Sequence, residues 1–309
     1  MTGQVSASRH LRRLYTGATV PIAILTFDFD PILRLGDGLV VRWWTVTLAT
    51  LILVVLAAAG VAARRAALAP EDLLYIAVGA VPGAVVGGRL GDVLVRQDAY
   101  GARPLALLDP AVGGLELGLA VVGGVLTAAC VATLLGAPLG RWAHLLAVPL
   151  LLTLGAGKLT MALGGAGQGL PLDAAWATAY VGPGPWGSLA PDLPSHPAQI
   201  YEGVATLVVA LAMLGAQVAG AFRIQDGRVI LFAVAGWAAA RTAVSGTWRD
   251  PAVLGAVPAA GVLALAISVV AIVALLGASI WIPRQRAVAR AATAAAEPAW
   301  PDPETRTRF

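Results

Sequence analysis

The segment His196-Pro197-Ala198-Gln199-Ile200-Tyr201-Glu202 carries residue types that could do chemistry. It brings an imidazole, an amide, a phenol and a carboxylate together directly before an apolar run. Such groups can accept a proton or orient a polar substrate. Polar groups at the edge of an apolar span are costly unless they pair or serve a function. We therefore predict a site at a membrane boundary, with His196, Tyr201 and Glu202 as candidate catalytic groups and Gln199 in support.

Charged residues inside the apolar runs point to the same place. Because a charge in a bilayer costs a few kcal/mol, each should face the bundle interior or a polar cavity. These charged residues all lie near the outer-leaflet end of their spans, which favours a single cavity there. Guanidinium binds phosphate bidentately, which suits an anionic lipid headgroup. The candidate phosphate-binding residues are Arg89, Lys158, Arg241 and Arg249, and Glu116 is a fourth candidate catalytic residue.

Each of these residues also has a purely structural interpretation, which the sequence leaves open. Arg249 could be an interfacial anchor, and Lys158 could extend its ammonium to the surface. Arg89 and Glu116 could be structural ion-pair partners. His196 could cap its helix, and Tyr201 could be one more aromatic residue of the membrane interface.

The composition is that of an integral membrane protein. Of the 309 residues, 58% are hydrophobic and 12% charged, and the mean hydropathy is +0.80. Soluble domains carry roughly 25% charged residues. Lys158 is the only lysine, and the arginines are scattered, so the sequence does not resemble a nucleic-acid-binding protein. The single Cys130 excludes an internal disulfide, and His10, His144 and His196 lack metal-ligand spacing, so we expect neither a metal nor a cofactor.

The hydropathy pattern predicts an all-α membrane protein with about seven transmembrane helices, because roughly 20 apolar residues span a bilayer. The predicted spans are 43–63, 73–95, 112–135, 142–164, 199–220, 229–248 and 253–282. The run from Leu14 to Phe27 resembles a signal peptide but lacks a clear cleavage site. We interpret it as part of an uncleaved interfacial segment over residues 1–42.

The distribution of basic residues predicts the orientation. With the C-terminus in the cytoplasm and the N-terminus outside, the inner loops hold Arg64, Arg65, Arg141, Arg223 and Arg228. The Gly- and Pro-rich loop 165–198, which contains no Lys or Arg, would then face outward. We therefore predict a membrane domain over 43–282 and a disordered cytoplasmic tail over 283–309.

Several motifs, in order, resemble the prolipoprotein diacylglyceryl transferase family of bacterial plasma membranes. Residues 196–202 resemble its fifth-span motif most specifically, and the resemblance covers roughly residues 27 to 282. The other segments that resemble the family's motifs are Phe27-Asp-Phe-Asp-Pro31, Val41-Arg-Trp-Trp44, Gly87-Gly-Arg-Leu-Gly91, Gly113-Gly-Leu115 with Gly123-Gly124, Gly155-Ala-Gly-Lys158, and Arg241 with Trp248-Arg-Asp-Pro251.

The resemblance implies a seven-span fold and a transfer reaction. Such enzymes move the diacylglyceryl unit of phosphatidylglycerol onto the lipobox cysteine of a prolipoprotein and release glycerol phosphate. The implied partners are phosphatidylglycerol, the prolipoprotein signal peptide and the bilayer. In this interpretation the arginines hold the phosphate and a base helps to form the thiolate.

The sequence also departs from the family pattern. Gly118 stands where the third span usually has histidine, and Lys158 replaces the signature arginine. Further signature positions are occupied by Trp44, Met161, Gly164, Ala166 and Ser245. The alternative function is therefore a catalytically degenerate member that binds lipid or lipoprotein without chemistry. A small transporter is a third class, motivated only by the charges within spans.

Overall fold

The computed structural model describes residues 25–36, 38–101, 104–109 and 113–296, and it is mostly helical. Seven of its helices are long and apolar enough to cross a membrane, which confirms the predicted number of spans. They are α2 (Trp43–Arg65), α3 (Pro70–Val95), α5 (Leu117–Leu134), α6 (Leu139–Met161), α7 (Ala198–Val218), α8 (Arg228–Ser245) and α9 (Ala259–Ala296).

The outer surface of the bundle is apolar, as a lipid-facing surface must be. Leu53 is 67% exposed, Val78 70% and Leu211 68%. The buried core is correspondingly small and forms two clusters. One lies among α5, α6, α7, α8 and α9, around Leu151 and Trp237, and the other lies among α2, α3, α5 and α6, around Leu73 and Trp142. The chain is therefore built to be surrounded by hydrocarbon, and its polar groups must be satisfied within the bundle.

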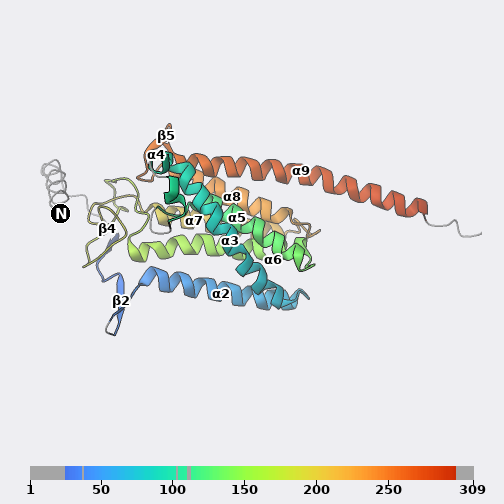
Figure 1. Ribbon diagram of the computed structural model, residues 1–309, viewed down its shortest axis with the longest axis horizontal. Coiled ribbons are helices and arrows are strands. Elements are labelled where there is room, and N and C mark those ends of the chain that lie inside the picture. Colours follow the sequence, from blue (N-terminus) through green and yellow to red (C-terminus); the bar gives the residue numbers. More distant parts are fainter. Residues whose placement is uncertain (1–24, 37, 102–103, 110–112, 297–309) are drawn as a thin grey trace, which may run out of the picture.

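Small residues let α3 and α5 pack closely. A methyl group at Gly83 would lie 2.2 Å from the carbonyl oxygen of Gly123, and one at Gly87 would lie 2.2 Å from that of Leu119. The other main contacts pair α6 with α7 and α2, and α8 with α9 and α7. The helices run side by side, with α3 crossing obliquely (Figure 1).

Short strands and loops gather at one end of the bundle (Figure 1). β1 (Leu25–Phe27) pairs in parallel with β4 (Thr178–Tyr180). β2 (Ile32–Leu35) and β3 (Leu39–Arg42) form a hairpin that leads into α2, and β5 (Ala252–Leu254) pairs with β6 (Val257–Pro258) before α9. The short helices α4 (Gln97–Gly101), η1 (Pro104–Leu107) and η2 (Ala162–Gly164) lie in the connections.

The predicted boundaries of two spans were wrong at their first residues. The third helix begins at Leu117 rather than 112, because Gly113 adopts a φ of +76° and Glu116 caps the helix. The seventh begins at Ala259 rather than 253, because the chain turns at Gly255, with a φ of +58°, and forms the β5–β6 hairpin. In both cases a glycine turn interrupts an otherwise apolar run.

The secondary structure near both ends of the chain differs from our expectations. Most of the run from Leu14 to Phe27 lies outside the described residues, and residues 25–42 form β1, β2 and β3. At the other end α9 continues to Ala296, so residues 283–296 are helical where we expected disorder. That segment is rich in alanine and arginine, which have high helix propensity and extend a helix already nucleated in the membrane.

Candidate functional site

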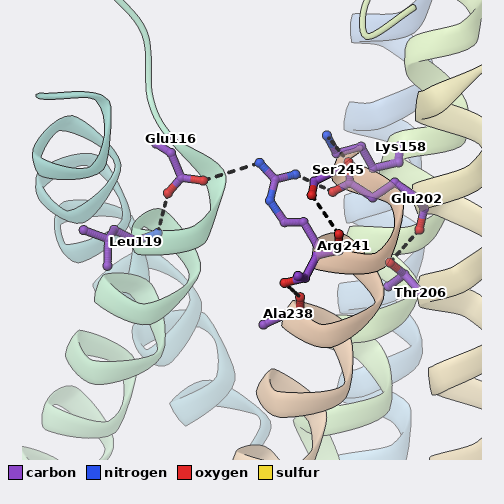
Figure 2. Close-up of polar contacts among 9 residues, drawn as sticks. Glu116, Leu119, Lys158, Glu202, Thr206, Ala238, Arg241 and Ser245 are labelled. Carbon is purple, nitrogen blue, oxygen red and sulfur yellow. Dashed lines mark hydrogen bonds and ion pairs between the residues drawn. The ribbon is translucent and has the colours of Figure 1, made fainter. Parts of the chain in front are cut away.

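Four charged side chains from four different segments meet at the loop-bearing end of the bundle. They are Glu116 before α5, Lys158 in the last turn of α6, Glu202 in α7 and Arg241 in α8, and we call them the charge cluster (Figure 2). Glu202 lies at its centre. Its two oxygens are 2.9 Å from the Lys158 Nζ and 2.5 Å from the Arg241 Nη1. The cluster is buried, and the Glu202 side chain is only 2% exposed.

Arg241 is held by carboxylates at both terminal nitrogens. Nη1 donates to Glu202, and Nη2 lies 3.4 Å from a Glu116 oxygen. The guanidinium carbon is 4.5 Å from the centroid of the Trp248 ring, a distance typical of a cation–π contact. Arg241 is therefore fixed on three sides by groups that favour its positive charge.

The cluster borders a cavity of about 210 Å³. Its wall combines residues from α6, α7, α8 and α9 and from the loops before α7 and after α8. The lining residues are Lys158, Gly167, Gln168, Gln199, Glu202, Arg241, Trp248, Arg249, Asp250 and Ala260. Glu116 is not among them, so it contacts Arg241 from behind the wall.

Arg249 also lines the cavity, but its partners are neutral. Its Nε donates to the Gly169 carbonyl at 2.6 Å, and its Nη2 donates to the hydroxyl of Ser195 at 3.0 Å. Further bonds reach Ser188, Gln168 and Ala190. Burial lowers the pKa of Arg249 below its usual value. Among the described residues Arg249 has no ion-pair partner, so its charge fixes the loop 165–198 without being neutralised.

Gln199 connects the cavity to the aromatic side chains of the loop region. The side chain is 2% exposed, and its amide nitrogen donates to the Tyr180 hydroxyl at 2.8 Å. The Tyr180 ring stacks on Phe27 of β1 with centroids 4.8 Å apart. Burial raises the pKa of Tyr180 to about 12, so the phenol stays protonated at physiological pH. Tyr180 therefore holds Gln199 as a neutral hydrogen-bonding group.

His196 and Tyr201 lie beside the cavity rather than in its wall. The backbone of His196 pairs with Leu170 and Gly169, at 2.9 Å and 2.8 Å, and so ties the start of α7 to the loop. Its ring contacts Tyr201 edge to face at 5.9 Å. Among the described residues the buried His196 Nδ1 has no hydrogen-bond partner. The two residues thus belong to the entry of α7, while Glu202, which directly follows Tyr201, points to the cluster.

Arg89 does not share the cavity, contrary to our expectation of a single chamber. Its guanidinium donates to backbone carbonyls of the segment after α4, at 2.9 Å to Leu107 and 2.8 Å to Ala106, and also to Asp109 and Gly114. It borders a separate, mainly apolar cavity of about 540 Å³ with Val85, Leu90 and Leu115. Carbonyl dipoles compensate the charge of Arg89. The same hydrogen bonds hold the connection between α3 and α5 in its folded conformation.

Apart from Lys158, the residues that depart from the signature do not line the cavity. Ser245 donates to the Thr242 carbonyl at 2.7 Å, and a methyl group on Gly261 of α9 would lie 2.3 Å from its Oγ. Trp44 covers Gly164, and Ala166 contacts Gly187. Above Gly118, the space that a side chain would need is filled by the Glu116 carboxylate and by the end of the Ile267 side chain.

Sequence reasoning missed five lining residues: the small residues Gly167 and Ala260, and the larger residues Gln168, Trp248 and Asp250. Gln168 gave no signal because single polar residues in a loop are common. Asp250 lies in the motif Trp248-Arg-Asp-Pro251, but nothing in the sequence marks it as a cavity residue. Trp248 belongs to a motif we had noted, and its stacking on Arg241 follows from neither spacing nor hydropathy. Within the described residues, no group of three or more His, Cys, Asp or Glu is arranged to hold a metal ion.

Comparison with known proteins gives consistent matches. The family model for prolipoprotein diacylglyceryl transferase matches residues 31–277. A phosphatidylglycerol–prolipoprotein diacylglyceryl transferase of Trichormus variabilis is 26% identical over 253 residues, which cover 80% of this chain and 88% of that protein. The protein of the same name from a Nostoc species matches equally well. One from Gluconacetobacter diazotrophicus is 29% identical over 190 residues, covering 60% of this chain and 65% of that protein.

Proposed function

The chain belongs to the prolipoprotein diacylglyceryl transferase family, and from this premise we propose that it transfers a diacylglyceryl group from phosphatidylglycerol to a lipobox cysteine. The observation that carries the proposal is the charge balance around the cavity. Three cations line the cavity: Lys158, Arg241 and Arg249. Two buried carboxylates, Glu202 and Glu116, pair with the first two of these cations. Asp250 is exposed at the edge, where water screens its charge. The buried excess of one positive charge matches a phosphodiester.

Lys158 and Arg249 are the cations we assign to the phosphate. Lys158 is 17% exposed at its side chain and has one ion-pair contact, so it keeps donors for a ligand. Arg249 adds a charge that no described carboxylate neutralises. As the C–O bond to phosphate breaks, a second negative charge develops on the leaving group, and preorganised cations stabilise it.

Glu202 is the group we assign to the thiol proton. Of the four predicted catalytic residues, it is the one whose side chain lines the cavity. The sulfur forms a bond to the glyceryl carbon, the phosphate leaves as glycerol phosphate, and the proton passes from the thiol toward the carboxylate. His196 and Tyr201 hold the start of α7, so that Glu202 meets its cations.

We place the protein as a multi-pass protein of the bacterial plasma membrane, with the cluster toward the outer face. The arginines at the opposite end of the bundle, Arg64, Arg65 and Arg141, support a cytoplasmic location for that end. The cavity then opens toward the leaflet from which lipid and signal peptide would arrive.

The test is to incubate the purified protein with labelled phosphatidylglycerol and a lipobox peptide. The proposal predicts a labelled thioether, which a peptide with serine at the lipobox position does not form. Glu202→Gln serves as the catalytic control. If no thioether forms, although the protein is folded and retains the lipid, transfer is excluded.

A non-catalytic, lipid-binding role is the second candidate. It is favoured by the carboxylates on both terminal nitrogens of Arg241, which leave that residue little freedom to rearrange. The discriminating experiment is complementation of cells depleted of their own transferase. Growth supports the enzyme, and failure despite normal membrane accumulation supports the binding role.

A further inference from the structure

Glu116 occupies a niche formed by glycines of two helices. Its backbone N–H donates to the Gly88 carbonyl at 2.8 Å. A methyl group on Gly91 of α3 would lie 2.8 Å from the Glu116 Cβ and 2.9 Å from its Oε2. A methyl group on Gly118 would lie 2.9 Å and 3.1 Å from the two carboxylate oxygens, and 2.9 Å from the flexible end of the Ile267 side chain. A side chain at either glycine would therefore compete with this carboxylate for space.

The carboxylate has two contacts that point in different directions. One oxygen accepts from the Leu119 N–H at 2.8 Å and caps α5. The other lies 3.4 Å from the Arg241 Nη2 (Figure 2). Capping alone is a task for serine, aspartate or asparagine, whose side chains are shorter. Only a longer side chain at 116 reaches both the helix N-terminus and the guanidinium.

We propose that Glu116 is a positioning residue: its carboxylate takes the space above Gly118 and, together with Glu202, fixes the direction of the Arg241 guanidinium. This inference rests on the proposed function for its effect on turnover, but not for its effect on Arg241. Glu116 does not line the cavity, so it acts through Arg241 rather than on the substrate.

The geometry explains why two carboxylates are needed. Glu202 binds Nη1 and Trp248 covers one face of the planar guanidinium, so without Glu116 the whole group can swing about its contact with Glu202. Arg241 and Lys158 share Glu202, so movement of Arg241 would also redistribute charge at Lys158. Glu116 thereby sets the arrangement of the whole charge cluster from outside the cavity.

Labelling of Arg241 tests the inference without relying on enzyme activity. Purified full-length protein is treated with an arginine-specific dicarbonyl, and modification at each arginine is followed by mass spectrometry. In Glu116→Ser the cap is retained but Arg241 loses a partner, so its modification should rise severalfold while that of Arg249 stays constant. Gly91→Ala, which crowds Glu116, should produce the same rise, whereas Gly215→Ala, with nothing within 4 Å, should not.

Relocation of the carboxylate provides the second readout. Gly118→Asp in the Glu116→Ser background returns a carboxylate to the same space and should restore the low reactivity of Arg241. In the transfer assay, Glu116→Ser should lower kcat by on the order of tenfold to a hundredfold, with partial recovery in the double variant.

Unchanged Arg241 reactivity in both Glu116→Ser and Gly91→Ala would overturn the inference, as would wild-type kcat in a folded Glu116→Ser enzyme. If Glu116→Ser fails to accumulate, the reactivity of Arg241 in Gly91→Ala decides whether the inference holds. Absence of transfer in every variant and in the wild type counts against the proposed function, while the labelling still decides the role of Glu116.

Discussion

Arg241 and Arg89 are two arginines in predicted spans near the same end of the bundle, yet their surroundings differ in kind. Arg241 lies between two buried carboxylates and an indole, beside a cavity. Arg89 donates to backbone carbonyls, lies 5.9 Å from the centroid of the Tyr100 ring, and holds a connection in shape without a carboxylate partner among the described residues. The comparison teaches that a charge inside a membrane span does not by itself indicate chemistry. Compensation by carboxylates around a polar cavity indicates a site, and compensation by carbonyls indicates an anchor.

Removal of the shared carboxylate should have the largest effect. Glu202→Ala leaves Lys158 and Arg241 buried without their common partner. Breaking a buried pair in this way destabilises a protein by about 3–5 kcal/mol. Thermal unfolding in detergent should shift to lower temperature, and transfer should be lost. Adding Lys158→Met should recover part of the stability, because one uncompensated charge is removed. Full stability in Glu202→Ala would contradict the described pairing.

Neutralising Lys158 should affect the lipid more than the fold. Lys158→Met removes one of the cations that we assign to the phosphate, and hydrogen bonds to charged groups contribute roughly 1.5–3 kcal/mol. Affinity for phosphatidylglycerol should fall on the order of tenfold to a hundredfold, as measured by titration in nanodiscs. Lys158→Arg keeps the charge and adds a second donor direction, so it should bind at least as well as the parent. Equal loss in both variants would show that size, not charge, matters.

Arg89→Gln should show the opposite pattern, with an effect on the fold and none on the lipid. It removes donors from several part-buried or exposed carbonyls of the segment after α4, and the net loss for each such hydrogen bond is about 0.5–1.5 kcal/mol. We expect a lower unfolding temperature but unchanged phosphatidylglycerol affinity and kcat per folded molecule. A selective loss of lipid affinity at full stability would return Arg89 to the phosphate site.

The smallest effect is expected at Tyr180. Tyr180→Phe removes the hydroxyl that pairs with Gln199, at a cost of about 1 kcal/mol. Because burial raises the pKa of Tyr180 to about 12, the phenol is protonated in both the folded and unfolded states below its ordinary pKa of 10. The stability difference between the two proteins should therefore be constant from neutral pH to about 9, as measured by unfolding across that range. A difference that grows within this range would show that the phenol ionises there.

The number of spans could be predicted because long apolar runs have few alternatives in a chain of this composition. The convergence of Lys158, Glu202 and Arg241 could be anticipated, because charges in spans must find partners inside the bundle. The starts of α5 and α9 could not, since Gly113 and Gly255 interrupt apolar runs through backbone conformation rather than hydropathy.

The roles of individual residues were harder to predict than their proximity. Arg89 and Arg241 look alike in sequence, and only their three-dimensional partners separate an anchor from a site. Glu116 reads as an isolated acid, and its contact with Arg241 depends on space left by Gly91 and Gly118 on two helices. Such relations join segments far apart in the chain and leave no local pattern.

Native mass spectrometry of the detergent-purified protein with defined lipids tests the central claim most directly, because it counts bound phosphatidylglycerol and phosphatidylethanolamine separately. We expect preferential retention of phosphatidylglycerol, which should be lost in Lys158→Met and kept in Arg89→Gln. Equal retention of the two lipids, or a preference that survives Lys158→Met and disappears in Arg89→Gln, would contradict this expectation.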